Sequence, residues 1–182
     1  KLVEHEKSYA IPEAVSLLKQ MPHPKFDETV EVSFKLGVDP KQTDQTVRGT
    51  VSLPHGSGRK VRVVALCKGE IENVAKEAGA DYVGSNDLIE KIVTGWLEFD
   101  AVVAHPSLMR EGSKLGKILG PRGLMPSPKA GTVTEDIGTA VREIKAGRVE
   151  YKMDKQASLH IPAGNVSFEE RHISENISAI LE

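Results

Sequence analysis

The chain has 182 residues, enough for one or two domains, with an ordinary globular balance of 39% hydrophobic and 27% charged residues. A formal net charge of −2 excludes a uniformly basic coat for nucleic acid, so any site for a polyanion is expected to be local. The single Cys67 excludes a disulfide framework and fits a reducing compartment. No apolar run approaches the roughly 20 residues that span a bilayer, and the charged residues 1–10 do not form a signal peptide.

The N-terminal segment combines a short helical pattern with a clear strand pattern. Residues 10–20 are predicted to form a helix, because their apolar residues recur at helical spacing and Pro12 stands in the first turn. Residues 26–36 alternate between apolar and polar side chains, with Glu28 the one exception, which predicts a strand with one buried and one exposed face. The expected exposed residues are Asp27, Thr29, Glu31, Ser33 and Lys35, and the expected buried residues are Phe26, Val30, Val32, Phe34 and Leu36.

The central part of the chain has a different pattern. A weaker strand is expected over residues 46–53, and the Pro-His-Gly-Ser-Gly break at 54–58 is a candidate linker. Residues 61–67 then form a nearly continuous apolar run, typical of a strand covered on both faces. Short strands alternate with short helices beyond it, which implies a parallel sheet with right-handed crossovers. The expected helices are 70–78, 86–94 with Ser85 as its cap, and one that Thr134 caps and Gly147 ends; the expected strands are 81–84 and 99–104.

Beyond Gly147 the alternating pattern returns. Two strands are predicted here, joined by a hairpin around residues 154–156, and Ser167 with Glu170 forms a capping-box pattern at the start of a last helix. Since both ends of the chain share one pattern and the middle has another, we predict a fold class of α/β and α+β with two domains. Residues 1–56 and 148–182 would form a discontinuous α+β domain, and residues 57–147 an inserted α/β domain.

The stretch 114–132, K-L-G-K-I-L-G-P-R-G-L-M-P-S-P-K-A-G-T, is basic and rich in glycine and proline. No acidic residue occurs between Glu111 and Glu135. This composition predicts an extended, mostly loop-like segment whose charges and accessible backbone N–H groups suit a polyanion, the alternative being a solvated loop without a partner. Its cationic residues are Lys114, Lys117, Arg122 and Lys129.

The sequence contains no recognisable catalytic, metal or cofactor motif. Gly116, Gly120 and Gly123 have the spacing of neither the dinucleotide fingerprint nor the P-loop, and the six histidines are too far apart for a local metal motif. Cys67 closes an apolar strand, where a buried and inert thiol is expected. We therefore predict no enzyme activity, no metal and no cofactor. The alternative is a small Rossmann-like enzyme that uses the basic loop on a phosphorylated substrate.

Several blocks of the sequence together resemble one known family. Gly-Pro-Arg-Gly-Leu-Met-Pro at 120–126, with Pro128-Lys129 and Gly131-Thr132, resembles the signature of the family of large-subunit ribosomal protein number one, the protein of the mobile ribosomal stalk. The resemblance covers nearly the whole chain, in the order of the family, and is to its bacterial or organellar form. Further matching blocks are Phe26–Val32, Asp44-Gln45, Val47–Thr50, Leu53–Gly56, Ala78–Asp81, Gly95-Trp96, Phe99-Asp100 and Asp154-Lys155 with His160.

The resemblance implies a fold, a function and a set of partners. It implies an RNA-binding domain built from both chain ends and an inserted Rossmann-like domain that binds no dinucleotide. It implies a non-catalytic, ribosome-bound protein of the cytoplasm, or of an organellar stroma or matrix. The implied partners are ribosomal RNA at the base of the stalk, deacylated exit-site tRNA whose release the protein assists, and its own mRNA, whose translation it represses; no membrane and no small-molecule substrate is implied.

The resemblance also implies a primary RNA surface on the domain built from the ends. Hydroxyl and imidazole groups can contact 2′-hydroxyls and phosphates, and lysine supplies charge. Glu31 would accept from a base amino group or a 2′-hydroxyl, or orient a lysine. For Phe26 a ring exposed to RNA is the alternative to the core position. The implied primary residues are Lys25, Phe26, Thr29, Glu31, Lys35, Asp154, Lys155, Ser158 and His160, and the basic loop would make a secondary contact, mostly to phosphates.

The chain departs from the family pattern in a few places. Gln156 and Ala157 stand where the family usually has Thr-Gly, and Asn165 stands where it usually has Lys, which removes one expected phosphate contact. The family's Thr-Met-Gly-Pro segment, a central part of its RNA site, and its basic start are not among these 182 residues. RNA affinity is expected to be lower if the protein lacks those segments.

Overall fold

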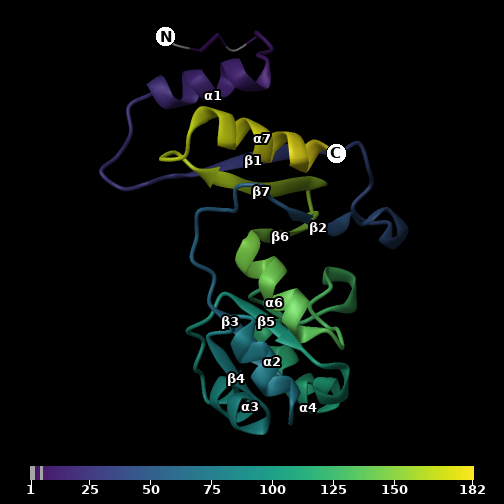
Figure 1. Ribbon diagram of the computed structural model, residues 1–182. Helices are drawn as coiled ribbons and strands as arrows, with labels where there is room; N and C mark the ends of the chain where they lie inside the picture. The colour runs from purple at the N-terminus through teal and green to yellow at the C-terminus, as the bar shows by residue number, and fades with distance from the viewer. Residues whose placement is uncertain (1–2, 5) are drawn as a thin grey trace. The chain divides into compact units, whose positions relative to one another are not determined.

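The computed structural model describes residues 3–4 and 6–182 and shows a mixed fold of helices and sheets (Figure 1). The chain folds into two compact units. One unit, here called the end-built unit, combines the N-terminal part up to Arg59 with Gly147–Glu182, and the other comprises Lys60–Ala146. None of the helices formed by the described residues combines the length and the apolar character needed to cross a membrane.

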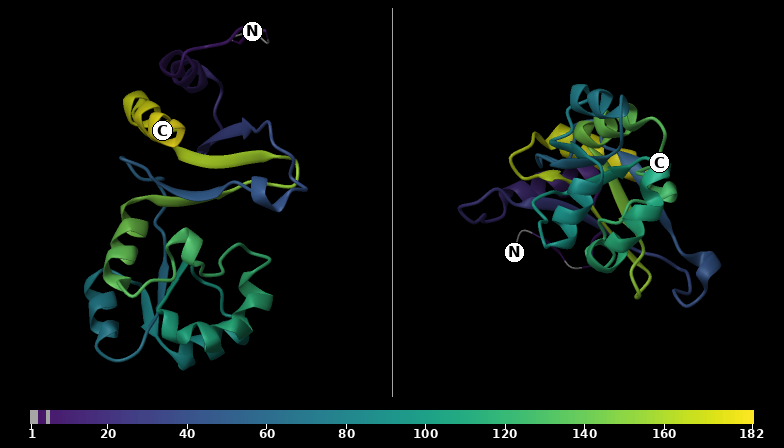
Figure 2. Two further views of the ribbon diagram at one scale, coloured as in Figure 1. Left: turned by 90° about the vertical axis from the view of Figure 1, so that its right-hand side faces the viewer. Right: turned by 90° about the horizontal axis from the view of Figure 1, so that it is seen from below.

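The end-built unit contains two antiparallel sheets of two strands each. In both sheets a strand from the N-terminal part pairs with a strand from the C-terminal part. Two helices lie on one side of the first sheet (Figures 1 and 2), and a cluster around Val15, Val30 and Ile173 fills the space between them. The elements are α1 (Ile11–Gln20), β1 (Thr29–Lys35), the short 3₁₀ turn Thr43–Gln45, β2 (Arg48–Ser52), β6 (Arg148–Lys152), β7 (Ser158–Asn165) and α7 (Glu170–Leu181).

The predicted hairpin at residues 154–156 is wrong. β6 pairs with β2 and β7 pairs with β1, so the two consecutive strands form no ladder with each other. A short turn between two alternating segments is a hairpin signal, but it contains no information about competing partners. Here Met153, Ala157 and Leu159 are buried together with Phe34 and Leu36 of the N-terminal part, and this burial favours pairing between the ends.

The unit Lys60–Ala146 is built on a parallel sheet with the strand order β4-β3-β5. All four residues of the central strand β3 are buried, because helices cover both faces of the sheet. Val63 and Ala65 face α2 and α6, whereas Val64 and Leu66 face α3. The elements are β3 (Val63–Leu66), α2 (Ile71–Glu77), β4 (Tyr82–Gly84), α3 (Asn86–Val93), β5 (Ala101–Ala104), α4 (Met109–Gly112), α5 (Gly116–Leu119), α6 (Ile137–Ala146) and the 3₁₀ turns Pro106–Leu108, Ser113–Leu115 and Pro128–Ala130.

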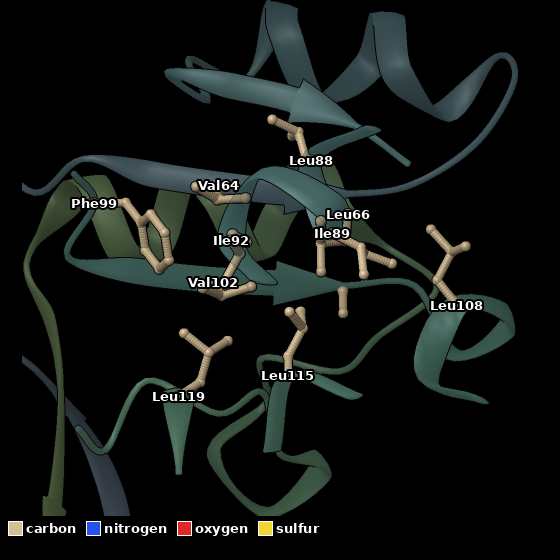
Figure 3. Packing of buried hydrophobic residues seen from close by; sticks show 11 residues of the cluster. Val64, Leu66, Leu88, Ile89, Ile92, Phe99, Val102, Leu108, Leu115 and Leu119 are labelled. Atoms are coloured by element: carbon tan, nitrogen blue, oxygen red, sulfur yellow. The ribbon is translucent and has the colours of Figure 1, made fainter. Parts of the chain in front are cut away.

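The basic stretch is less extended than its composition predicts. Its first part forms helical turns, and Leu115 and Leu119 are almost completely buried against the sheet, facing Val102 and Ile92 in one cluster (Figure 3). Two leucines at a spacing of four residues lie on one side of a helical turn, so burying both favours a helix here. The prediction of an extended segment, made for residues 114–132, is therefore wrong for residues 114–119.

Two of the three predicted helix caps differ from those in the structure. Ser85 is the N-cap residue of α3, as predicted, but its side chain makes no capping hydrogen bond. The first turn of α6 is held by Asp136, whose Oδ1 accepts a hydrogen bond from Thr139 N at 3.0 Å, rather than by Thr134. At α7 the N-cap is Glu169, and Ser167 has a different partner, described below.

Candidate nucleic-acid interface

The exposed side of the β1–β7 sheet carries most of the predicted primary residues. Thr29, Glu31, Ser33 and Lys35 alternate along β1 and are exposed, as the alternation predicts. The register pairs Ser33 with His160 and Lys35 with Ser158, and directly paired residues of antiparallel strands project from the same face. We call this surface the β1–β7 face; its residues are Thr29, Glu31, Ser33, Lys35, Ser158 and His160.

His160 lies at the centre of a polar network on this face. Its Nδ1 is 2.9 Å from Ser33 Oγ and 3.2 Å from Glu31 Oε1. Its Nε2 lies 4.0 Å from Asp154 Oδ2. Glu31 and His160 both keep about half of their side-chain surface, 51%, in contact with solvent. Glu31 therefore contacts an imidazole here, whereas the sequence left a base amino group, a 2′-hydroxyl or a lysine open as its partner, and both groups stay accessible to a ligand.

The turn between β6 and β7 is shaped by Asp154. Its Oδ1 accepts hydrogen bonds from the backbone N–H groups of Gln156 and Ser158, each at 2.8 Å. The N–H of Ser158 is the main cause that lowers the pKa of Asp154 below its ordinary value of 3.8. Lys35 Nζ donates to the carbonyl oxygen of Gln156. Lys155 is exposed at the tip of the same turn.

Phe26 lies outside the strand and is not part of the core. β1 begins at Thr29, and 70% of the surface of Phe26 is exposed, so the prediction that Phe26 faces the core is wrong. Lys25 beside it is exposed as well. The alternation ends before residue 29 because the preceding chain leaves the ladder. An exposed aromatic ring next to a lysine is a surface on which an unpaired base could stack.

The structure reveals an anchor for this segment that the sequence pattern did not indicate. Asp27 Oδ1 accepts from Ser167 N at 3.0 Å, and its Oδ2 accepts from Ser167 Oγ at 2.7 Å and from Asn165 Nδ2 at 2.9 Å. The Ser167 hydroxyl is the main cause that lowers the pKa of Asp27. The sequence did not indicate this role of Ser167, because Ser167 fits a local capping-box motif, whereas its actual partner Asp27 lies far away in the sequence.

The primary residues thus form a band along the β1–β7 sheet. Lys25 and Phe26 lie before the start of β1, which pairs with the end of β7, whereas Asp154 and Lys155 lie at the other end of the sheet. The seven residues of β1, with six steps of about 3.4 Å between them, give the strand part of the band a length of roughly 20 Å.

The four basic residues of the predicted secondary site are all exposed, and none has an ion-pair partner among the described residues. The nearby Lys68, by contrast, pairs with Glu111 at 3.2 Å. Leu115 and Leu119 anchor one end of the loop, and at the other end Thr132 O accepts from Ala104 N at 2.8 Å. Charges that have no acidic partner and lie on an anchored loop can attract phosphates. The residues are Lys114, Lys117, Arg122 and Lys129.

The structure offers little to support a catalytic or metal centre. Within residues 3–4 and 6–182, no group of three histidine, cysteine or acidic side chains is placed to hold a metal ion. Cys67 is buried, as expected, and burial raises the pKa of its thiol to about 11, which disfavours the reactive thiolate.

Comparison with known proteins identifies the family. The model of the ribosomal protein L1p/L10e family matches residues 17–182. The large ribosomal subunit protein uL1 of Kosmotoga olearia is 55% identical over 182 residues, which cover 100% of this chain and 79% of that protein. The protein of the same name from Thermus thermophilus is 57% identical over 180 residues, 98% of this chain and 79% of the relative. That from Protochlamydia amoebophila is 55% identical over 181 residues, 100% of this chain and 77% of the relative. The chain therefore belongs to the ribosomal protein L1p/L10e family.

Proposed function

We propose that this protein is a structural constituent of the large ribosomal subunit and that it binds ribosomal RNA. The observation that carries this proposal is an identity of 55% to 57%, over nearly the whole chain, with proteins named as large ribosomal subunit protein uL1. Membership of a ribosomal protein family supports a non-catalytic role. The alternative of a small enzyme for a phosphorylated substrate has no support among these relatives.

The proposed RNA-binding domain comprises residues 1–56 and 148–182, around an inserted domain of residues 57–147, and these bounds lie within three residues of those of the end-built unit. The exposed polar groups of the β1–β7 face can hydrogen-bond to phosphates and to 2′-hydroxyls, and it is the 2′-hydroxyl that distinguishes RNA from DNA. The exposed ring of Phe26 supports the same assignment, since it can stack on a base. Lys25 and Lys155 flank the face and would neutralise phosphates.

The basic loop is proposed as a secondary contact. Its four cations lack acidic partners among the described residues, so their charges are available to the RNA backbone. We also propose the further roles that the family resemblance implies: contact with deacylated tRNA at the exit site of a bacterial or organellar ribosome, and repression of the protein's own mRNA through the same β1–β7 face.

A salt titration of RNA binding tests the proposal. The affinity of the protein for a folded ribosomal stalk RNA is compared with that for an unrelated hairpin of equal length, for the wild type, Phe26→Ala and Lys129→Ala. Stacking on an aromatic ring contributes about 1–3 kcal/mol per base, so Phe26→Ala should weaken stalk binding by about 5- to 150-fold. Lys129→Ala should weaken binding to both RNAs and reduce the salt slope by about 1.

Leu181→Ala serves as the control, because Leu181 is also a large exposed apolar residue, on α7, and lies outside the β1–β7 face. It should leave both affinities unchanged. Equal losses for Phe26→Ala and Lys129→Ala would contradict a primary site on the end-built unit. Equal, weak and steeply salt-dependent binding of the wild type to both RNAs would contradict specific binding altogether.

A further inference from the structure

The segment that presents Lys25 and Phe26 is a short loop between α1 and β1, yet both of its sides are fastened. An exposed aromatic residue on a free loop loses conformational entropy when it binds, and this loss reduces affinity. Phe26 is exposed to 70%, so its own side chain makes little contact that could hold it. The contacts that hold the loop must therefore come from its neighbours.

On the N-terminal side the loop closes on itself. His23 Nδ1 lies 2.9 Å from Glu28 Oε2, and His23 Nε2 lies 3.3 Å from the carbonyl oxygen of Lys19 in α1. The hydrogen bond to Glu28 is the main cause that raises the pKa of His23, which favours the protonated imidazole with two N–H donors. The four residues between His23 and Glu28 therefore form the tip of a closed loop.

On the C-terminal side the loop is attached to the connection between β7 and α7. Asp27 accepts three hydrogen bonds, two from Ser167 and one from Asn165, at 2.7–3.0 Å. Next to it, Val166 N donates to the carbonyl oxygen of Glu28 at 2.9 Å. Asp27, which directly follows Phe26, thus makes the side-chain contacts that attach the loop to the rest of the unit.

We infer that Asp27 is a positioning residue for RNA binding, which holds Phe26 in the orientation that meets the RNA and acts through Phe26 without touching the RNA itself. This role rests on the proposed function. Asp27 is suited to it because all three donors reach a single carboxylate, and a charged acceptor makes stronger hydrogen bonds than a neutral one. Asn165 serves as one of the donors to Asp27, through its side-chain NH₂ group.

A double-mutant cycle distinguishes this role from a merely structural one. Asp27→Asn keeps the shape of the side chain but replaces one acceptor oxygen by an NH₂ group, so at least one of the three hydrogen bonds is lost and the negative charge is removed. We expect it to weaken binding to the stalk RNA by roughly 3- to 10-fold in the wild-type background and by less than about 2-fold in a Phe26→Ala background, because coupled residues are non-additive. Ser167→Ala removes one of the three donors. It should cause a smaller loss of affinity in the wild-type background and little further loss in the Phe26→Ala background.

A second measurement follows the ring directly in the free protein. With fluorine-labelled phenylalanine, Asp27→Asn should change the NMR signal of Phe26 and leave those of Phe34 and Phe99 unchanged. Equal losses of affinity in both backgrounds, or an unchanged Phe26 signal, would overturn the inference. If instead the wild type shows no preference for the stalk RNA, the proposed function fails and the inference with it. A wild type that prefers the stalk RNA, together with an Asp27→Asn variant of unaltered affinity, would remove the inference alone.

Discussion

The buried Asn176 of α7 provides a sharp test of how the end-built unit is held together. Its side chain is fully buried and uses both of its polar atoms. Oδ1 accepts from His55 N at 3.0 Å, and Nδ2 donates to the carbonyl oxygens of Gly56 at 3.0 Å and Ala163 at 2.8 Å. Asn176 thereby joins α7, β7 and the Pro-His-Gly segment that follows β2.

Replacing Asn176 by Ala removes all three hydrogen bonds. The two partners in the partly buried His55-Gly56 segment can recover some hydration, so each lost bond should cost about 1 kcal/mol. The carbonyl of Ala163 is buried and would stay unsatisfied, at a cost of about 1–3 kcal/mol. We expect a total loss of about 3–5 kcal/mol, a large fraction of the roughly 5–15 kcal/mol by which a typical domain is stable.

Urea unfolding followed by far-UV circular dichroism measures this loss, and amide hydrogen exchange at the buried Ile173 reports on the end-built unit by itself. Asn73→Ala is the control, because Asn73 is exposed on α2 in the other unit, and it should change stability by less than about 0.5 kcal/mol. A loss below about 1 kcal/mol for Asn176→Ala would refute the argument that these three bonds hold the segment to α7.

Two further predictions concern the turn before β7 and the acid stability of α7. Ala157 is the one non-glycine residue with a positive φ, 58°, within the described part of the chain, so Ala157→Val should cost about 2 kcal/mol or more in urea unfolding, because a β-branched residue is strained there and the site is buried. Ala157→Gly should change stability by less than about 1 kcal/mol, since relief of strain is offset by chain entropy and the lost methyl group; a larger loss for Gly than for Val would contradict this. Hydrogen bonds from Arg171 and then His55 lower the pKa of Glu175 from 4.5 to about 2. The stability that this carboxylate contributes is therefore complete above about pH 4.5 and is lost as the pH falls toward 2. Glu175→Gln should therefore lower the urea midpoint at pH 7, and the midpoints of variant and wild type should converge near pH 2. The control Glu90→Gln, at an exposed position, should leave the midpoint unchanged at both pH values. An equal difference between Glu175→Gln and wild type at pH 7 and pH 2 would refute the prediction.

Most secondary-structure elements could be predicted from the sequence, because their signals are local. Alternation over β1 correctly identified its exposed residues, and the apolar run at residues 61–67 correctly indicated a strand covered on both faces. The helices near 11–20, 71–77, 86–93, 137–146 and 170–181 were predicted to within a few residues at most ends. The family could be recognised for the same reason, since its motifs are short contiguous blocks.

The candidate site was only partly predictable. The sequence identified the polar residues of β1 and the four cations of the basic loop, and the structure finds them exposed. It did not identify Asp27, because the three donors to that carboxylate lie on Asn165 and Ser167, far along the chain. For Phe26 it left a core position and an exposed ring as alternatives, because alternation alone does not tell where a strand begins, and the structure shows the exposed ring.

The sequence by itself determined the type of most elements, the face that β1 turns toward solvent, and the family. Only the tertiary structure decided which strands pair, that Leu115 and Leu119 make the start of the basic stretch helical, and that Asp27 fastens the loop of Phe26. The physical reason is that periodicity and turn chemistry act between residues a few positions apart. Pairing partners and anchoring contacts instead depend on how much apolar surface distant segments bury together and on how many hydrogen bonds they form with each other. These quantities cannot be read from any single stretch of the sequence.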